Sequence, residues 1–174
     1  MHLSTLVEIA ADLRRKAGLI RPPYSSRAII EASFPSALVT GGILPEGVDE
    51  MVSQRPDGPV IIYARHLSGP GQRYVIGHGV AHLIFDDESV CARAGSRGDP
   101  AAEARADLFS ALLYVPFEDL RPLVRHWPSR DLEDHEIYLD HVDQLASTFQ
   151  MPAAVIDEQI QRLVPVDVFV KRCG

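Results

Sequence analysis

Two histidines in one apolar stretch, His78 and His82, have the spacing of a metal site. Residues four apart on an α-helix share a face and lie about 5–6 Å apart, so both imidazoles can reach one cation. Zinc peptidases use this H-x-x-x-H arrangement with a glutamate after the first histidine, where it positions the attacking water. Here that position is Gly79. The motif predicts a metal site without its usual general base; a pair of purely structural histidines is the alternative.

The helix expected over residues 73–85 is apolar on nearly every side, which predicts that it is buried. Buried imidazoles need polar partners, and a metal ion and a carboxylate would supply them. Glu103 is the candidate third ligand, because most of the other positions in its expected helix, 101–114, are apolar. Rival ligands in the intervening loop are Cys91, Asp86 and Asp87. Two histidines, one glutamate and an open fourth position form the usual arrangement of a catalytic zinc site.

A dinucleotide-binding turn is a second interpretation of the same stretch. Gly77 and Gly79 fit the first two glycines of that motif, and Glu103 follows about twenty residues later. The third glycine is replaced by His82, however, and no second parallel strand is expected before Glu103. The pattern therefore favours the metal site.

The elements around the motif predict a mostly helical α+β fold with a small sheet packed on the metal-site helix. Pro100 is placed to open the helix that carries Glu103, and Pro116 to end it. Loops are expected over residues 67–72 and 86–100. The other expected helices cover residues 3–17, 26–31, 117–126, 135–150 and 152–164. The expected strands cover residues 36–40, 59–65 and 166–170.

The composition is that of a globular protein, with 46% hydrophobic and 24% charged residues in a chain of 174. We expect a single domain over residues 1–174, with no membrane span and no secretion signal, and therefore a cytoplasmic protein. The net charge of -7 argues against direct binding of nucleic acid, whose phosphates favour a basic surface. Cys91 and Cys173 are expected to be free thiols.

Two segments together resemble the ImmA/IrrE family of zinc metallopeptidases: QRYVIGHGVAHLIF and, later, EARADLFSALLYVP. The first resembles the family pattern R-[FY]-x-x-x-H-E-x-x-H, and the second resembles the family's segment that begins with a metal-binding glutamate. The resemblance extends over about residues 55–163. The matching positions are Arg73, Tyr74, His78, His82, Glu103, Ala106, Asp107 (for the usual Asn), Phe109, Leu112, Leu113 and Pro116.

The resemblance implies a zincin-like core in which His78, His82 and Glu103 bind one zinc ion, with manganese as an alternative metal. It also implies that the protein partner is a helix-turn-helix repressor, cleaved by the active members of the family. The chain has no obvious helix-turn-helix extension, so the repressor would be a separate protein.

The departure from the family is Gly79 at the position of the catalytic glutamate. The loss of a general base typically costs a factor of 10²–10⁴ in rate. Three explanations remain open: a pseudo-peptidase that acts as a protein-binding regulatory module, an engineered loss of the acid, or a base supplied from elsewhere in the chain. Candidates for such a base are Asp86, Asp87, Glu88, His126, His135 and His141.

Overall fold

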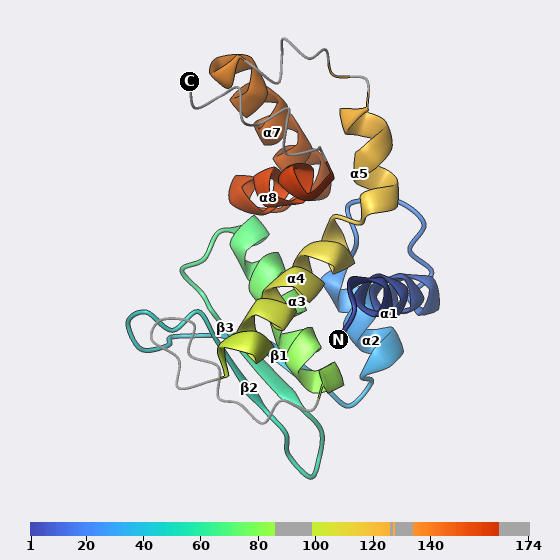
Figure 1. The fold of residues 1–174 in the computed structure, drawn as a ribbon. Helices are drawn as coiled ribbons and strands as arrows, with labels where there is room; N and C mark the ends of the chain where they lie inside the picture. The colour runs from blue at the N-terminus through green and yellow to red at the C-terminus, as the bar shows by residue number, and fades with distance from the viewer. Residues whose placement is uncertain (86–98, 126, 128–133, 164–174) are drawn as a thin grey trace.

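The computed structural model describes residues 1–85, 99–125, 127 and 134–163, which form a mostly helical α+β fold (Figure 1). The helices are α1 (Leu3–Lys16), α2 (Ser26–Ser33), α3 (Gly69–Phe85), α4 (Pro100–Tyr114), α5 (Phe117–Val124), α7 (His135–Phe149) and α8 (Ala153–Leu163). The strands are β1 (Leu38–Gly42), β2 (Glu50–Ser53) and β3 (Val60–Ala64). None of the helices in these ranges is long and apolar enough to cross a membrane.

The three strands form one sheet in the order β1-β3-β2. β1 runs parallel to β3, with Leu38 opposite Val60, and β2 runs antiparallel to β3, with Glu50 opposite Tyr63. Side chains alternate between the two faces of a strand, so Glu50 and Val52 project from the same face of β2. Both are buried, because α3 packs on this face of the sheet.

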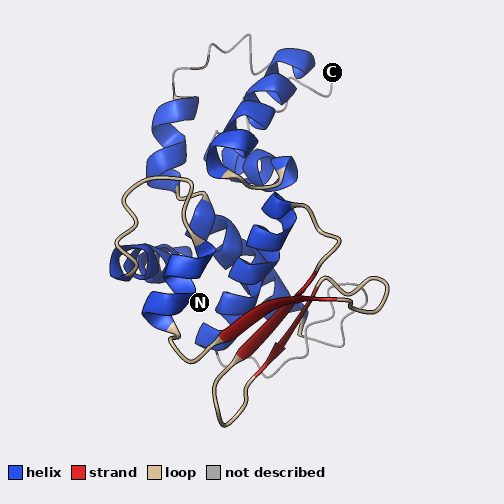
Figure 2. Cartoon of the chain, turned by 180° about the vertical axis from the view of Figure 1, so that it is seen from behind, coloured by secondary structure: helices blue, strands red, loops and turns tan. Residues whose placement is uncertain are grey.

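Helix α3 lies at the centre of the described structure, in contact with β2 and β3 on one side and with α4 on the other (Figures 1 and 2). Its buried positions surround the helix axis, as the apolar sequence predicts. Helix α1 packs on α4, and α7 packs on α8. The metal-site motif is therefore carried by a helix enclosed between the sheet and α4.

Two glycines allow α3 to be so closely packed. A Cβ atom at Gly77 would lie 2.5 Å from both Ser110 Oγ and Tyr114 Cε2 on α4. A Cβ atom at Gly79 would lie 3.1 Å from a methyl carbon of Ile61 and 3.2 Å from one of Val52, on the sheet side. Each glycine lowers the intrinsic stability of the helix, and the close packing of neighbouring elements that it permits offsets this loss.

The expected elements were largely confirmed, with three corrections. Residues 69–72, expected in a loop, form the first turn of α3. Gly41 and Gly42, expected to end the first strand, are its last two residues. The short strand β2 was not predicted at all. The expected strand 166–170 and most of the expected loop 86–100 lie outside the described residues.

Candidate metal centre

The two histidines of the motif lie one turn apart on α3 and are both buried, with 1% of each residue exposed. Their ring centroids are 4.8 Å apart. The i, i+4 spacing therefore brings both imidazoles to one point, as predicted. Because the surrounding core is apolar, these rings require polar partners inside the protein.

Helix α4 supplies acidic partners on the Nε2 side of the rings. Glu103 Oε2 lies 3.4 Å from His78 Nε2, and Glu103 Oε1 lies 3.8 Å from His82 Nε2. Asp107, one turn further along α4, places Oδ1 3.6 Å from His78 Nε2 and accepts a hydrogen bond of 2.8 Å from the Tyr74 hydroxyl. The structure thus brings together the three residues predicted as ligands and adds Asp107 beside them.

These spacings fit a metal ion. Two ligand atoms on a tetrahedral zinc ion, with bonds of about 2.0–2.1 Å, lie about 3.3–3.4 Å apart. His78 Nε2 is also fully enclosed and makes no hydrogen bond within the part of the chain that the structure describes. A buried nitrogen without a hydrogen bond, facing a carboxylate at ligand spacing, suits coordination to a cation.

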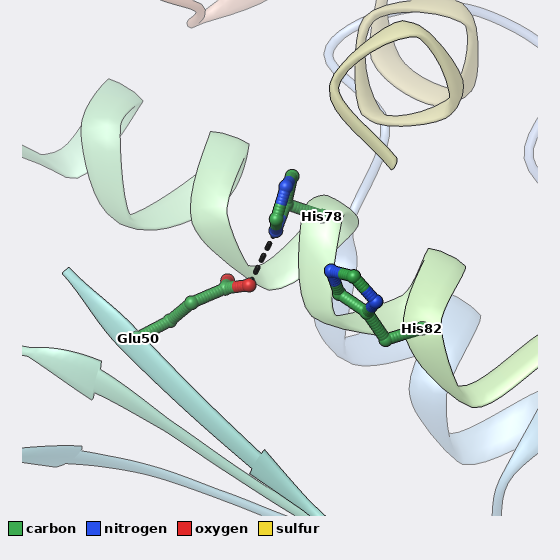
Figure 3. Close-up of side chains that lie close together, drawn as sticks. All are labelled: Glu50, His78 and His82. Atoms are coloured by element: carbon green, nitrogen blue, oxygen red, sulfur yellow. Dashed lines mark hydrogen bonds and ion pairs between the residues drawn. The ribbon is translucent and has the colours of Figure 1, made fainter. Parts of the chain in front are cut away.

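A third acid, Glu50 on β2, was missed by the sequence analysis. Its side chain is buried and its Oε1 accepts a hydrogen bond from His78 Nδ1 (Figure 3). Glu50, His78 and His82 offer ligand atoms within 4.8 Å of one another, so this buried group could bind a metal ion. The available signal was the alternation of Glu50 and Val52 in a short segment between two turns, which is too brief to predict a strand on its own.

The acids control the charge of His78. Burial lowers the pKa of His78, but the hydrogen bond that His78 donates to Glu50 and the negative charges of Glu50, Asp107 and Glu103 outweigh this effect, so the pKa is raised above its ordinary value. Carboxylates that favour an imidazolium also favour a divalent cation in the same place. Metal binding at this site would therefore compete with protonation of His78.

Gly79 faces the sheet, and the side chains of Ile61 and Val52 are the nearest to a Cβ atom added there. Of the alternative bases, Asp86, Asp87, Glu88 and His126 lie outside the described residues, as does the rival ligand Cys91. His135 is exposed on α7, and His141 on the same helix stacks on Trp127 with ring centroids 4.5 Å apart. Neither histidine of α7 belongs to the buried group around His78.

Comparison with known proteins identifies the fold and the family. A solved structure described as a Mycobacterium tuberculosis transcriptional regulator superposes with a TM-score of 0.62 at 15% identity, over 92% of this chain and 47% of that chain. The chain therefore spans about half the length of that protein and shares its fold. No curated protein sequence matches the chain. The model of the Peptidase_M78 family, described as the IrrE N-terminal-like domain, matches residues 43–161, which include β2, both histidines and Glu103, and the chain therefore belongs to this family.

Proposed function

We propose that this protein is a metallopeptidase-like regulator that holds one divalent metal ion with His78, His82 and Glu103. The observation that carries the proposal is the position of Glu103, whose two carboxylate oxygens lie 3.4 and 3.8 Å from the two Nε2 atoms. Zinc is the first choice of metal, because two imidazoles and one carboxylate are a common zinc ligand set. Manganese is the alternative, since the nearby carboxylates are hard ligands.

The reaction that this site would support is hydrolysis of a peptide bond in a protein. A bound zinc ion supplies Lewis acidity toward a peptide carbonyl and lowers the pKa of water. The chain itself supplies a buried site whose carboxylates would balance the positive charge of the ion. It supplies no acid at position 79, and we propose that hydrolysis is consequently slow or absent.

The partner that we propose is a helix-turn-helix repressor, as the family resemblance implies. The fold shared with a protein described as a transcriptional regulator supports a regulatory role. We further propose that residues 1–174 act as a single domain in the cytoplasm.

The first test is metal content, measured by mass spectrometry on untagged protein beside the His78→Ala variant. We expect one equivalent of metal in the parent protein and its loss in the variant. The second test is incubation of the metal-loaded protein with a purified helix-turn-helix repressor, with and without chelator. An absence of metal in both proteins would refute the proposed site.

A second candidate function is a non-catalytic module that binds its partner without cutting it. The observation that favours it is the packing at Gly79, where the sheet lies against the backbone and leaves little room for an acid. Binding of an intact repressor that persists in chelator would support this module. Cleavage that chelator abolishes would support the peptidase instead.

A further inference from the structure

The hydrogen bond between Glu50 and His78 joins two elements that the motif does not connect. Glu50 lies on β2 with 0% of the residue exposed, and His78 lies on α3 with 1% exposed. A carboxylate buried to this extent is costly unless it is hydrogen-bonded. The hydrogen bond from His78 Nδ1 supplies such a partner for Glu50 Oε1.

The two nitrogens of His78 face different partners. Nδ1 faces Glu50 Oε1, whereas Nε2 faces Glu103 Oε2 at 3.4 Å and Asp107 Oδ1 at 3.6 Å. A neutral imidazole carries its proton on one nitrogen only. If Nδ1–H donates to Glu50, the lone pair of Nε2 is directed toward Glu103 and is available for a metal ion.

We propose that Glu50 is the positioning residue for His78: it holds the ring orientation and the Nδ1–H tautomer that present Nε2 to the metal. The inference rests on the proposed metal site. In this role Glu50 is neither a ligand nor the replacement for the missing base, because its carboxylate contacts the nitrogen that points away from Glu103. A carboxylate on the outer nitrogen also makes the imidazole a stronger ligand.

Gly79 belongs to the same arrangement. Val52, which shares a face of β2 with Glu50, would contact a Cβ atom at position 79 at 3.2 Å, which is tighter than most Cβ contacts in proteins. The absence of a side chain at Gly79 therefore lets β2 approach α3 closely enough for Glu50 to reach His78. On this proposal, the hydrogen bond between Glu50 and His78 depends on the absence of a side chain at Gly79.

The test compares Glu50→Gln and Glu50→Ala with the parent protein, and uses Glu46→Gln, an exposed acid that precedes the same strand, as the control. Three quantities are measured: zinc affinity by chelator competition, the visible spectrum of the Co²⁺-loaded protein, and the ¹⁵N shifts of His78 in metal-free protein at a pH where the imidazole is neutral. The last readout needs neither metal nor activity.

We expect Glu50→Ala to weaken zinc binding about 10–100-fold and to shift His78 away from the Nδ1–H tautomer. Glu50→Gln retains a hydrogen-bond acceptor, so it should keep the tautomer, lose less affinity and leave the Co²⁺ spectrum unchanged. Glu46→Gln should match the parent protein in all three measurements.

Two results would overturn the proposal. A Co²⁺ spectrum that indicates a changed coordination number in Glu50→Gln would make Glu50 a ligand. Unchanged affinity and unchanged ¹⁵N shifts in Glu50→Ala would leave it without a positioning role. If the parent protein binds no metal, the proposed function fails, and the ¹⁵N shifts still decide whether Glu50 selects the tautomer. Glu50→Gln, which keeps the shape of the side chain, provides the answer if Glu50→Ala does not fold.

The link to Gly79 is tested by Gly79→Ala and the double variant Gly79→Ala/Glu50→Gln. Because the added methyl group pushes β2 away from α3, we expect Gly79→Ala to weaken zinc binding. The loss in the double variant should be smaller than the combined losses of the two single variants, since both disturb the same hydrogen bond. Fully additive losses, or no loss in Gly79→Ala, would show that Gly79 and Glu50 act independently.

Discussion

At the scale of single residues, the acids around His78 have different geometries and should therefore contribute differently to metal binding. Glu103 reaches both Nε2 atoms, and its side chain is only 17% exposed. Asp107 reaches one of them, its side chain is 44% exposed, and its Oδ1 is already held by Tyr74. Glu50 contacts His78 at Nδ1. Glu103 is thus the acid best placed to bridge the two imidazoles.

We expect Glu103→Gln to weaken zinc binding far more than Asp107→Asn does. Removal of a ligand should cost more than the roughly 10–100-fold loss typical of an outer partner, whereas Asp107→Asn retains an acceptor for Tyr74. Both affinities are measured by chelator competition, with thermal unfolding of the metal-free proteins as the folding control. Equal losses in the two variants would place Asp107 among the ligands.

At the scale of elements, the crossing of α3 and α4 determines the site, because each helix carries part of it. The crossing is close at Gly77, where an added Cβ atom would lie 2.5 Å from Ser110 Oγ and Tyr114 Cε2. At Gly71, in the first turn of α3, the nearest atom to an added Cβ would be Ser68 Oγ at 3.4 Å. The two glycines therefore allow a comparison of alanine substitution at a closely packed position and at an open position of the same helix.

We expect Gly77→Ala to destabilise the protein by about 1–3 kcal/mol through overpacking. Gly71→Ala should instead stabilise it by up to about 1 kcal/mol, because alanine favours the helix and nothing obstructs its methyl group. Chemical denaturation of both variants measures the free energy of unfolding. A stabilising Gly77→Ala would contradict the close crossing.

At the scale of the whole molecule, a metal bound between α3 and α4 should stabilise the native state over the unfolded one. At a free zinc concentration of about 100 times the dissociation constant, the expected gain is about 2.7 kcal/mol. For a chain of this size this corresponds to an increase of roughly 5–10 °C in Tm. Calorimetry with and without zinc measures it, and the increase should vanish in His78→Ala.

The stability of the fold should also fall in alkaline solution. Burial raises the pKa of Tyr114, whose hydroxyl donates to Ser26 Oγ, from 10.0 to about 12. Above pH 10 the unfolded chain therefore loses this proton before the native state does, so stability declines between pH 10 and about 12. The loss due to Tyr114 is on the order of 1–3 kcal/mol. Urea unfolding across this range should show a shallower decline for Tyr114→Phe.

Local patterns in the sequence determined most of the helices and half of the site. The apolar run around His78 and His82 predicts a buried helix, and the four-residue spacing places both imidazoles on one face regardless of the rest of the fold. Pro100 begins α4 with Asp99 as its N-cap, as its fixed φ favours. Such features depend on neighbours within one or two turns of the chain.

Only the tertiary structure decided what surrounds those imidazoles on the sheet side. Glu50 is 28 residues from His78, on a strand too short to be recognised without its pairing to β3. The meaning of Gly79 likewise depends on the sheet, because the side chains that approach it belong to β2 and β3. In the sequence, Gly79 stands where the motif usually has an acid. In the fold, it is a position at which the sheet packs closely on α3. Pairing and packing of segments far apart in the chain decide both features, since neither follows from local periodicity.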